Sequence, residues 1–118
     1  MKALVVDDAI FMRRMISGLT SQLGYEIIEA ENGEEAVALA KAELPDIIVM
    51  DIVMPKMDGI TAMKMIKSER DVKVILCSSL IDKKQIKEAI NAGADNYIPK
   101  PISKTDFIKV LTETSRII

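Results

Sequence analysis

The sequence predicts an α/β fold, in which a parallel sheet of five strands carries helices on both faces. Five short apolar runs alternate along the chain with five stretches of helical periodicity. Such alternation produces a sheet covered on both sides, because each strand–helix–strand crossover is right-handed. The length of 118 residues indicates one domain, and a hydrophobic content of 49% is sufficient for a buried core.

The five predicted strands are short apolar runs bounded by turn residues, a pattern typical of strands that are buried on both faces. The second run is interrupted by Glu26, which indicates a strand at the edge of the sheet. Pro55 follows the third run and stops any continuation of the ladder. The five runs are residues 3–6, 25–28, 47–50, 72–77 and 96–98.

The first predicted helix follows the first strand and ends at Gly24, with Arg13 and Arg14 on the side opposite its apolar stripe. The second covers residues 34–41, after an Asn32-Gly33 turn, and has acidic residues early and a lysine late, as the helix dipole favours. The residues expected to face inward are Met12, Met15, Ile16, Leu19 and Leu23 in the first helix and Ala36, Val37 and Ala40 in the second.

The third helix is predicted to open at Asp58-Gly59, and the fourth to cover residues 82–91 before Gly93. The fifth begins at Ser103, with Asp106 three residues later as in a capping box. The residues expected to face inward are Ala62, Met63 and Ile66, then Ile86, Ala89 and Ile90, then Phe107, Val110 and Leu111.

The composition excludes several kinds of chemistry. The chain has no histidine, so histidine acid–base catalysis and Ser–His triads are excluded, and with one cysteine, Cys77, there is neither a Cys/His zinc site nor an internal disulfide. A net charge of −2 gives no attraction to nucleic acid, and no apolar run approaches the length of a membrane span. We expect a cytoplasmic protein with no direct nucleic-acid binding and no membrane insertion.

Polar side chains follow the predicted strands at the points where they end. Asp7 and Asp8 follow the first strand, Asp51 the third, Ser78 the fourth and Lys100 the fifth. Each alone suits an ordinary turn, capping or surface position. Because the carboxyl ends of parallel strands share one edge of the sheet, where α/β proteins bind their ligands, we expect these side chains to converge there.

Three carboxylates in one pocket repel one another, and each raises the pKa of its neighbours. A hard divalent cation held by oxygen atoms resolves that repulsion, and Mg²⁺, or Mn²⁺ in its place, suits this donor set. Asp51 would keep a free oxygen that can attack phosphorus, while Lys100 and Ser78 neutralise and hydrogen-bond the phosphoryl oxygens. The expected product is an aspartyl phosphate on Asp51.

These residues resemble the receiver domain of bacterial response regulators, in particular its stand-alone, chemotaxis-type members. The resemblance covers the whole chain and implies a single receiver domain, residues 1–118, with a flavodoxin-like (βα)5 sheet of strand order 2-1-3-4-5. The stretches that match the family are residues 5–8, 50–51, 54–59, 77–79 and 100–101.

The resemblance also implies a role for each acidic residue. Asp51 is the phosphoacceptor, and Mg²⁺ is bound by Asp8, Asp51 and the backbone carbonyl of Val53, with Asp7 acting through water. Lys100 pairs with the phosphoryl group, and its peptide bond to the following proline is expected to be cis.

A switch and a set of partners follow from the same resemblance. Ser78 takes the place of the switch hydroxyl and Tyr97 that of the switch aromatic, which turns inward on phosphorylation. The protein is then a signalling receiver and not an enzyme. A sensor histidine kinase donates the phosphoryl group from a phosphohistidine. A downstream protein, such as a flagellar motor switch protein, binds the face of the fourth helix, fifth strand and fifth helix.

Two further hypotheses concern positions that the family pattern does not fix. Val53 and Leu80 flank the path of the hydrolytic water and are both apolar, which favours slow self-dephosphorylation and a separate phosphatase or reverse transfer. Outward lysines border the output face and are consistent with an acidic partner, although a solvated helix face is the simpler explanation of them. These lysines are Lys83, Lys84, Lys87, Lys104 and Lys109.

Other readings remain open at this stage. A phosphohydrolase of the haloacid-dehalogenase type requires a second acid where Val53 stands, and an FMN carrier requires a Ser/Thr-rich loop where Asp7 and Asp8 would repel phosphate. A phosphate-independent binding scaffold is disfavoured by the intact acidic set and Lys100. The chain end soon after the fifth helix favours a stand-alone protein, but a receiver cut from a longer regulator with a DNA-binding or methylesterase domain would read the same.

Overall fold

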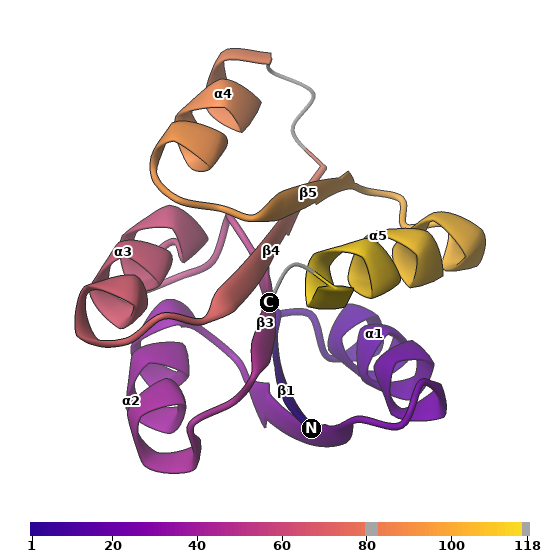
Figure 1. The fold of residues 1–118 in the computed structure, drawn as a ribbon. Helices are drawn as coiled ribbons and strands as arrows, with labels where there is room; N and C mark the ends of the chain where they lie inside the picture. Colours follow the sequence, from indigo (N-terminus) through magenta and orange to yellow (C-terminus); the bar gives the residue numbers. More distant parts are fainter. Residues whose placement is uncertain (80–82, 117–118) are drawn as a thin grey trace.

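The computed structural model describes residues 1–79 and 83–116, and within them five strands alternate with five helices (Figure 1). The strands are β1 (Lys2–Val6), β2 (Glu26–Ala30), β3 (Ile47–Asp51), β4 (Lys73–Ser78) and β5 (Asn96–Pro99). The helices are α1 (Ile10–Gln22), α2 (Gly33–Glu43), α3 (Gly59–Glu69), α4 (Lys83–Asn91) and α5 (Lys104–Arg116). The predicted alternation is confirmed. The predicted start of α4 at Asp82 lies outside the described residues.

The strands form one parallel sheet in the order β2-β1-β3-β4-β5, which confirms the predicted fold. The register places Val6 beside Met50 and Asp51 beside Cys77, so β1, β3 and β4 end at nearly the same level. The side chains that follow these ends therefore meet at one edge, which we call the carboxyl edge. β2 is an edge strand, as its polar interruption predicts.

The central strands are buried on both faces because the sheet lies between two layers of helices (Figure 1). Helices α1 and α5 cover one face, and α2, α3 and α4 cover the other. Alternate residues of a strand therefore enter different cores. The core toward α1 and α5 includes Val5, Val49, Ile75, Phe107 and Leu111, and the core toward α2 to α4 includes Leu4, Ile48, Met50, Ala62 and Met63.

Several helix ends follow the predicted signals. The side chain of Asp58 accepts a hydrogen bond from the backbone N–H of Thr61 at 2.9 Å, and Ser103 Oγ accepts one from the N–H of Asp106 at 3.3 Å. Asn32 is the N-cap of α2 and not part of a separate turn, so this helix begins at Gly33. None of the helices in residues 1–79 and 83–116 has the length and apolar character that a membrane span requires.

Three side-chain placements differ from the sequence prediction. Arg13, expected on the solvent side of α1, is buried beside β2, because Glu29 of that strand supplies an ion-pair partner at 2.8 Å. Ile90, expected to face inward, is 52% exposed, because α4 contacts the sheet through Ala89 and the next residue points away from it. Leu23 is exposed because α1 ends one residue earlier.

Candidate functional site

Asp51 is the last residue of β3, and its surroundings fix its backbone closely. The next residue, Ile52, donates its N–H to the carbonyl of Cys77 at 3.0 Å and accepts a hydrogen bond from the N–H of Gly59 at 2.8 Å. A methyl group at Gly59 would overlap the carbonyl oxygen of Asp51, so this position requires glycine. Because the carboxylate of Asp51 is only partly accessible, burial raises its pKa, and the charge of Lys100 only partly opposes this effect.

Asp7 and Asp8 follow β1 directly and differ in their exposure. Asp7 is fully buried, and its Oδ1 atom accepts a hydrogen bond from the N–H of Ala9 at 2.9 Å. Its own N–H extends the ladder to the carbonyl of Ala30 at 3.2 Å. Asp8 is exposed, and since the N-cap residue of α1 is Ala9, the simple capping role considered for Asp8 is not observed.

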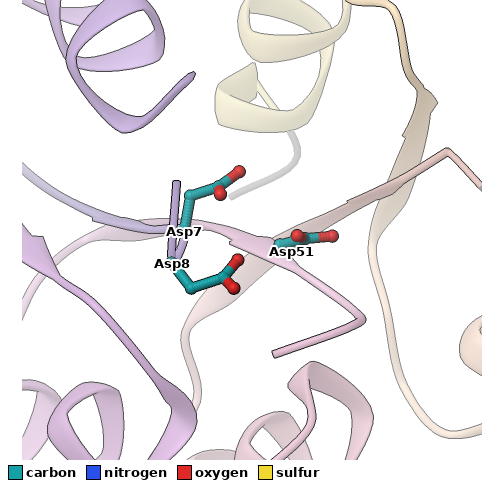
Figure 2. A group of neighbouring side chains, drawn as sticks. All are labelled: Asp7, Asp8 and Asp51. Carbon is teal, nitrogen blue, oxygen red and sulfur yellow. The ribbon is translucent and has the colours of Figure 1, made fainter. Parts of the chain in front are cut away.

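The carboxylates of Asp7, Asp8 and Asp51 form one cluster at the carboxyl edge (Figure 2). Each side chain offers an oxygen atom, and these three atoms all lie within 4.8 Å of one another. Hard carboxylate oxygens at this spacing fit a divalent cation such as Mg²⁺. The cluster could therefore bind a metal, and the donor chemistry predicted from the sequence is present.

Lys100 joins this cluster from the end of β5. Its Nζ atom lies 2.9 Å from Oδ2 of Asp7 and 3.2 Å from Oδ2 of Asp51. Burial alone would lower the pKa of Lys100, but the hydrogen bond to Asp7 and the charge of Asp51 outweigh it and raise the pKa. The peptide bond between Lys100 and Pro101 is cis, as expected. A fixed cation therefore lies beside the carboxylate of Asp51.

Ser78 and Tyr97 lie on the neighbouring strands β4 and β5 and contact each other. Ser78 ends β4 and is buried, and its carbonyl accepts hydrogen bonds from the N–H of Lys100 at 2.9 Å and from the phenol of Tyr97 at 3.2 Å. Burial raises the pKa of Tyr97, and the groups of Cys77 and Asp51 add to this effect. In this structure the ring of Tyr97 is thus already linked to the end of β4.

The structure brings the predicted site residues to one edge, although they come from four strands and their following loops. Val53 lies in the loop after β3, and its side chain is 56% exposed. Leu80, the second position assigned to the path of the hydrolytic water, lies outside the described residues. Arg13 was missed as a contact of the site, because only the fold brings it to the carbonyl of Asp7 and to Glu29, 16 residues away.

Comparisons with known proteins agree on one family. The model of the response regulator receiver domain matches residues 3–112. The chemotaxis protein CheY of Bacillus subtilis is 42% identical over 115 residues, which are 96% of each chain, and that of Thermotoga maritima is 43% identical over 98% of each chain. The response regulator domain of Thermotoga maritima CheB superposes with a TM-score of 0.90 at 33% identity, covering 100% of this chain and 98% of that domain.

Proposed function

Since this chain belongs to the family of response regulator receiver domains, we propose that residues 1–118 form a single receiver domain that accepts a phosphoryl group on Asp51. Proteins of this family are signalling proteins, and the CheY relatives align over nearly their full length. The observation that carries the proposal is the contact of Lys100 with Asp51 inside the acidic cluster. It joins a nucleophilic carboxylate, a cation and metal-ligating oxygens at one point.

The proposed donor is a phosphohistidine of a sensor histidine kinase. A carboxylate oxygen of Asp51 attacks the phosphorus atom, the phosphorus–nitrogen bond breaks, and its electron pair returns to the imidazole nitrogen, which takes up a proton. The ammonium group of Lys100, already 3.2 Å from Asp51, then neutralises charge on the transferred group. In hydrolysis, water attacks phosphorus and the Asp51 carboxylate leaves with the bonding electrons.

The proposed metal is Mg²⁺, with Mn²⁺ as a substitute, held by Asp8, Asp51 and the carbonyl of Val53. When bound, the cation neutralises the phosphoryl oxygens during transfer. Asp8 is exposed and available for direct coordination. Both oxygens of Asp7 already have partners, namely the N–H of Ala9 and Nζ of Lys100, which supports an indirect role for Asp7 through water.

The proposed switch consists of Ser78 and Tyr97. Ser78 Oγ would donate to the phosphoryl group, and the movement of β4 would change the position of Tyr97, whose phenol is bound to the Ser78 carbonyl. Tyr97 also lines a hollow of about 330 Å³ between β5 and α5, together with Pro99, Ser103 and Lys109. A change at Ser78 would thereby reach the surface of α4, β5 and α5.

The proposed output partner binds this surface through acidic groups. Each of the lysines predicted to point outward is exposed in the structure, which supports a basic face for a partner such as a flagellar motor switch protein. These lysines are Lys83, Lys84, Lys87, Lys104 and Lys109. We place the protein in the cytoplasm, where kinase and partner would meet it. Charge reversal at Lys87 should weaken partner binding, and unchanged affinity would contradict an acidic partner.

The exposed side chain of Val53 supports slow hydrolysis of the aspartyl phosphate, because an apolar group there cannot hydrogen-bond an attacking water. Val53→Asn supplies an amide at this position and should speed loss of the phosphoryl group by about tenfold. This is less than the roughly 100-fold of a general base, because an amide can hydrogen-bond the water but cannot take up its proton. Decay of the phosphorylated protein, followed by mass spectrometry, tests this. A variant that loses phosphate no faster than the parent would rule out the hypothesis.

The decisive experiment is incubation of the protein with acetyl phosphate, with and without Mg²⁺, followed by mass spectrometry of the intact chain. We expect one phosphoryl adduct that requires Mg²⁺ in the parent and is missing in Asp51→Asn. An adduct that persists in Asp51→Asn would place the acceptor elsewhere. A parent chain that stays unmodified would favour a scaffold that binds partners without phosphorylation.

A further inference from the structure

Arg13 of α1 connects the acidic cluster to the edge strand β2. Its side chain is 8% exposed. Nη1 donates a hydrogen bond to the backbone carbonyl of Asp7 at 2.9 Å, and Nε donates one to Glu29 Oε1 at 2.8 Å. The neighbouring Arg14 also contacts Glu29, at 3.3 Å, but its side chain is 69% exposed. Of these two adjacent arginines, Arg13 therefore holds the backbone of the site through its guanidinium group.

The carbonyl of Asp7 is a sensitive point in the backbone. It belongs to the planar peptide group that joins Asp7 to Asp8, so its direction also sets the direction in which Asp8 leaves the end of β1. The N–H of Asp7 is fixed by Ala30 and its side chain by Ala9 and Lys100. Arg13 fixes the carbonyl by donating a hydrogen bond to it, and removal of Arg13 would take this partner from the carbonyl of a buried residue.

We propose that Arg13 is a positioning residue for the metal site: it orients the Asp7–Asp8 peptide so that the carboxylate of Asp8 faces Asp51. Glu29 holds the guanidinium in the orientation that reaches the Asp7 carbonyl. The inference rests on the proposed function, in which Asp8 is a direct ligand of Mg²⁺. Residues that orient ligands in this way typically change metal affinity by about 10- to 100-fold when they are removed.

The positioning role and a simple effect of charge predict opposite changes in Mg²⁺ affinity when Arg13 is replaced. Arg13 is a cation beside a cation site, so removing its charge alone should strengthen Mg²⁺ binding. Loss of its hydrogen bond to Asp7 should weaken Mg²⁺ binding, because Asp8 is then no longer held toward Asp51. A role in stability alone would lower the free energy of unfolding and leave the dissociation constant of the folded protein unchanged.

The experiment measures the dissociation constant for Mg²⁺ alone, by isothermal titration calorimetry at fixed ionic strength. Arg13→Met removes the guanidinium, Arg14→Met is the matched control, and Arg13→Lys keeps the charge but cannot reach both partners. We expect Arg13→Met to bind Mg²⁺ about tenfold more weakly than the parent. Arg13→Lys should also bind more weakly, and Arg14→Met should match the parent. Circular dichroism verifies that each variant is folded.

The outcomes distinguish the positioning role of Arg13 from the proposed metal site on which it rests. The positioning role of Arg13 is wrong if the parent binds Mg²⁺ and Arg13→Lys binds it as tightly as Arg14→Met does, together with any Arg13→Met that folds. The proposed metal site then still stands. If the parent binds no Mg²⁺, the proposed metal site is wrong and this role falls with it. Should Arg13→Met fail to fold, Arg13→Lys decides, because weaker binding with the charge retained supports positioning.

Discussion

Asp95 at one edge of the sheet and the acidic cluster at the other differ in the number of cations that accompany them. At the amino edge, where the strands begin, Asp95 accepts hydrogen bonds from Lys67 Nζ and from the N–H of Val74, both at 2.8 Å, and Lys73 Nζ lies 3.8 Å away. This one carboxylate therefore has two cations. At the carboxyl edge, the three clustered carboxylates have one lysine beside them among the ion pairs of the described residues, and this residue, Lys100, pairs with Asp7 and Asp51.

The difference lies in the ratio of cations to carboxylates, which is two to one at Asp95 and one to three in the acidic cluster. A compensated aspartate such as Asp95 connects β4, β5 and α3 and has a structural role. The uncompensated cluster leaves negative charge that a metal ion can neutralise. Substitutions at the two edges should therefore have opposite consequences for chemistry and for stability.

The sharpest test of this comparison replaces one lysine at each edge. Lys100→Met removes the cation beside Asp51 and should slow phosphorylation by acetyl phosphate by about 100-fold, the usual loss for one group that stabilises a developing anion. Lys67→Met removes a cation from Asp95 and should leave the rate unchanged. Time courses of the phosphoryl adduct by mass spectrometry measure both. Equal phosphorylation rates in Lys100→Met and Lys67→Met would contradict this difference between the two edges.

A second test measures stability at the compensated edge. Asp95→Ala removes hydrogen bonds to a backbone N–H and to a lysine, and should lower the free energy of unfolding by about 2 kcal/mol, as for other hydrogen bonds to charged groups. Urea denaturation provides this value. The folded variant should still accept a phosphoryl group at the parental rate, and a loss of phosphorylation would show that the edges are coupled.

The smallest expected effect concerns pH and Asp51. Because burial raises the pKa of Asp51, its folded form binds a proton more tightly than its unfolded form. The stability associated with this group is therefore present below its ordinary pKa of 3.8 and is lost as the pH rises through the raised value. In Mg²⁺-free urea titrations, Asp51→Asn should gain stability relative to the parent over this pH range. If the difference in the free energy of unfolding between Asp51→Asn and the parent does not vary with pH, the burial of this charge is not unfavourable.

The sequence allowed much of the fold to be predicted because its local signals agree with its tertiary structure. Apolar runs with polar residues at their ends located β1, β3 and β4, and the parallel arrangement then brought Asp7, Asp8 and Asp51 together. The strand order came from resemblance to receiver domains, and the structure confirms it. The bounds moved by one or two residues where ladders continue into polar residues, as at Ser78.

What could not be predicted depends on neighbours that lie far apart in the chain. The burial of Arg13 requires Glu29 on a separate strand, and helical periodicity alone placed it in solvent. The sequence also gave no reason for Lys100 to contact Asp7, because a long flexible side chain can reach several partners. Ile90 was misplaced because the periodicity does not show how much of a short helix the sheet covers.

Cys77 lies beside Asp51 on the neighbouring strand β4, so its reactivity can report on opening of the protein next to Asp51. Burial raises the pKa of this thiol to about 12, so it stays protonated and unreactive while the sheet is closed. An alkylating reagent can modify it only when the core between the sheet and helices α1 and α5, in which Cys77 is buried, opens. The labelling rate of one sulfur atom therefore reports how often this core opens beside the proposed acceptor, Asp51, without any engineered probe.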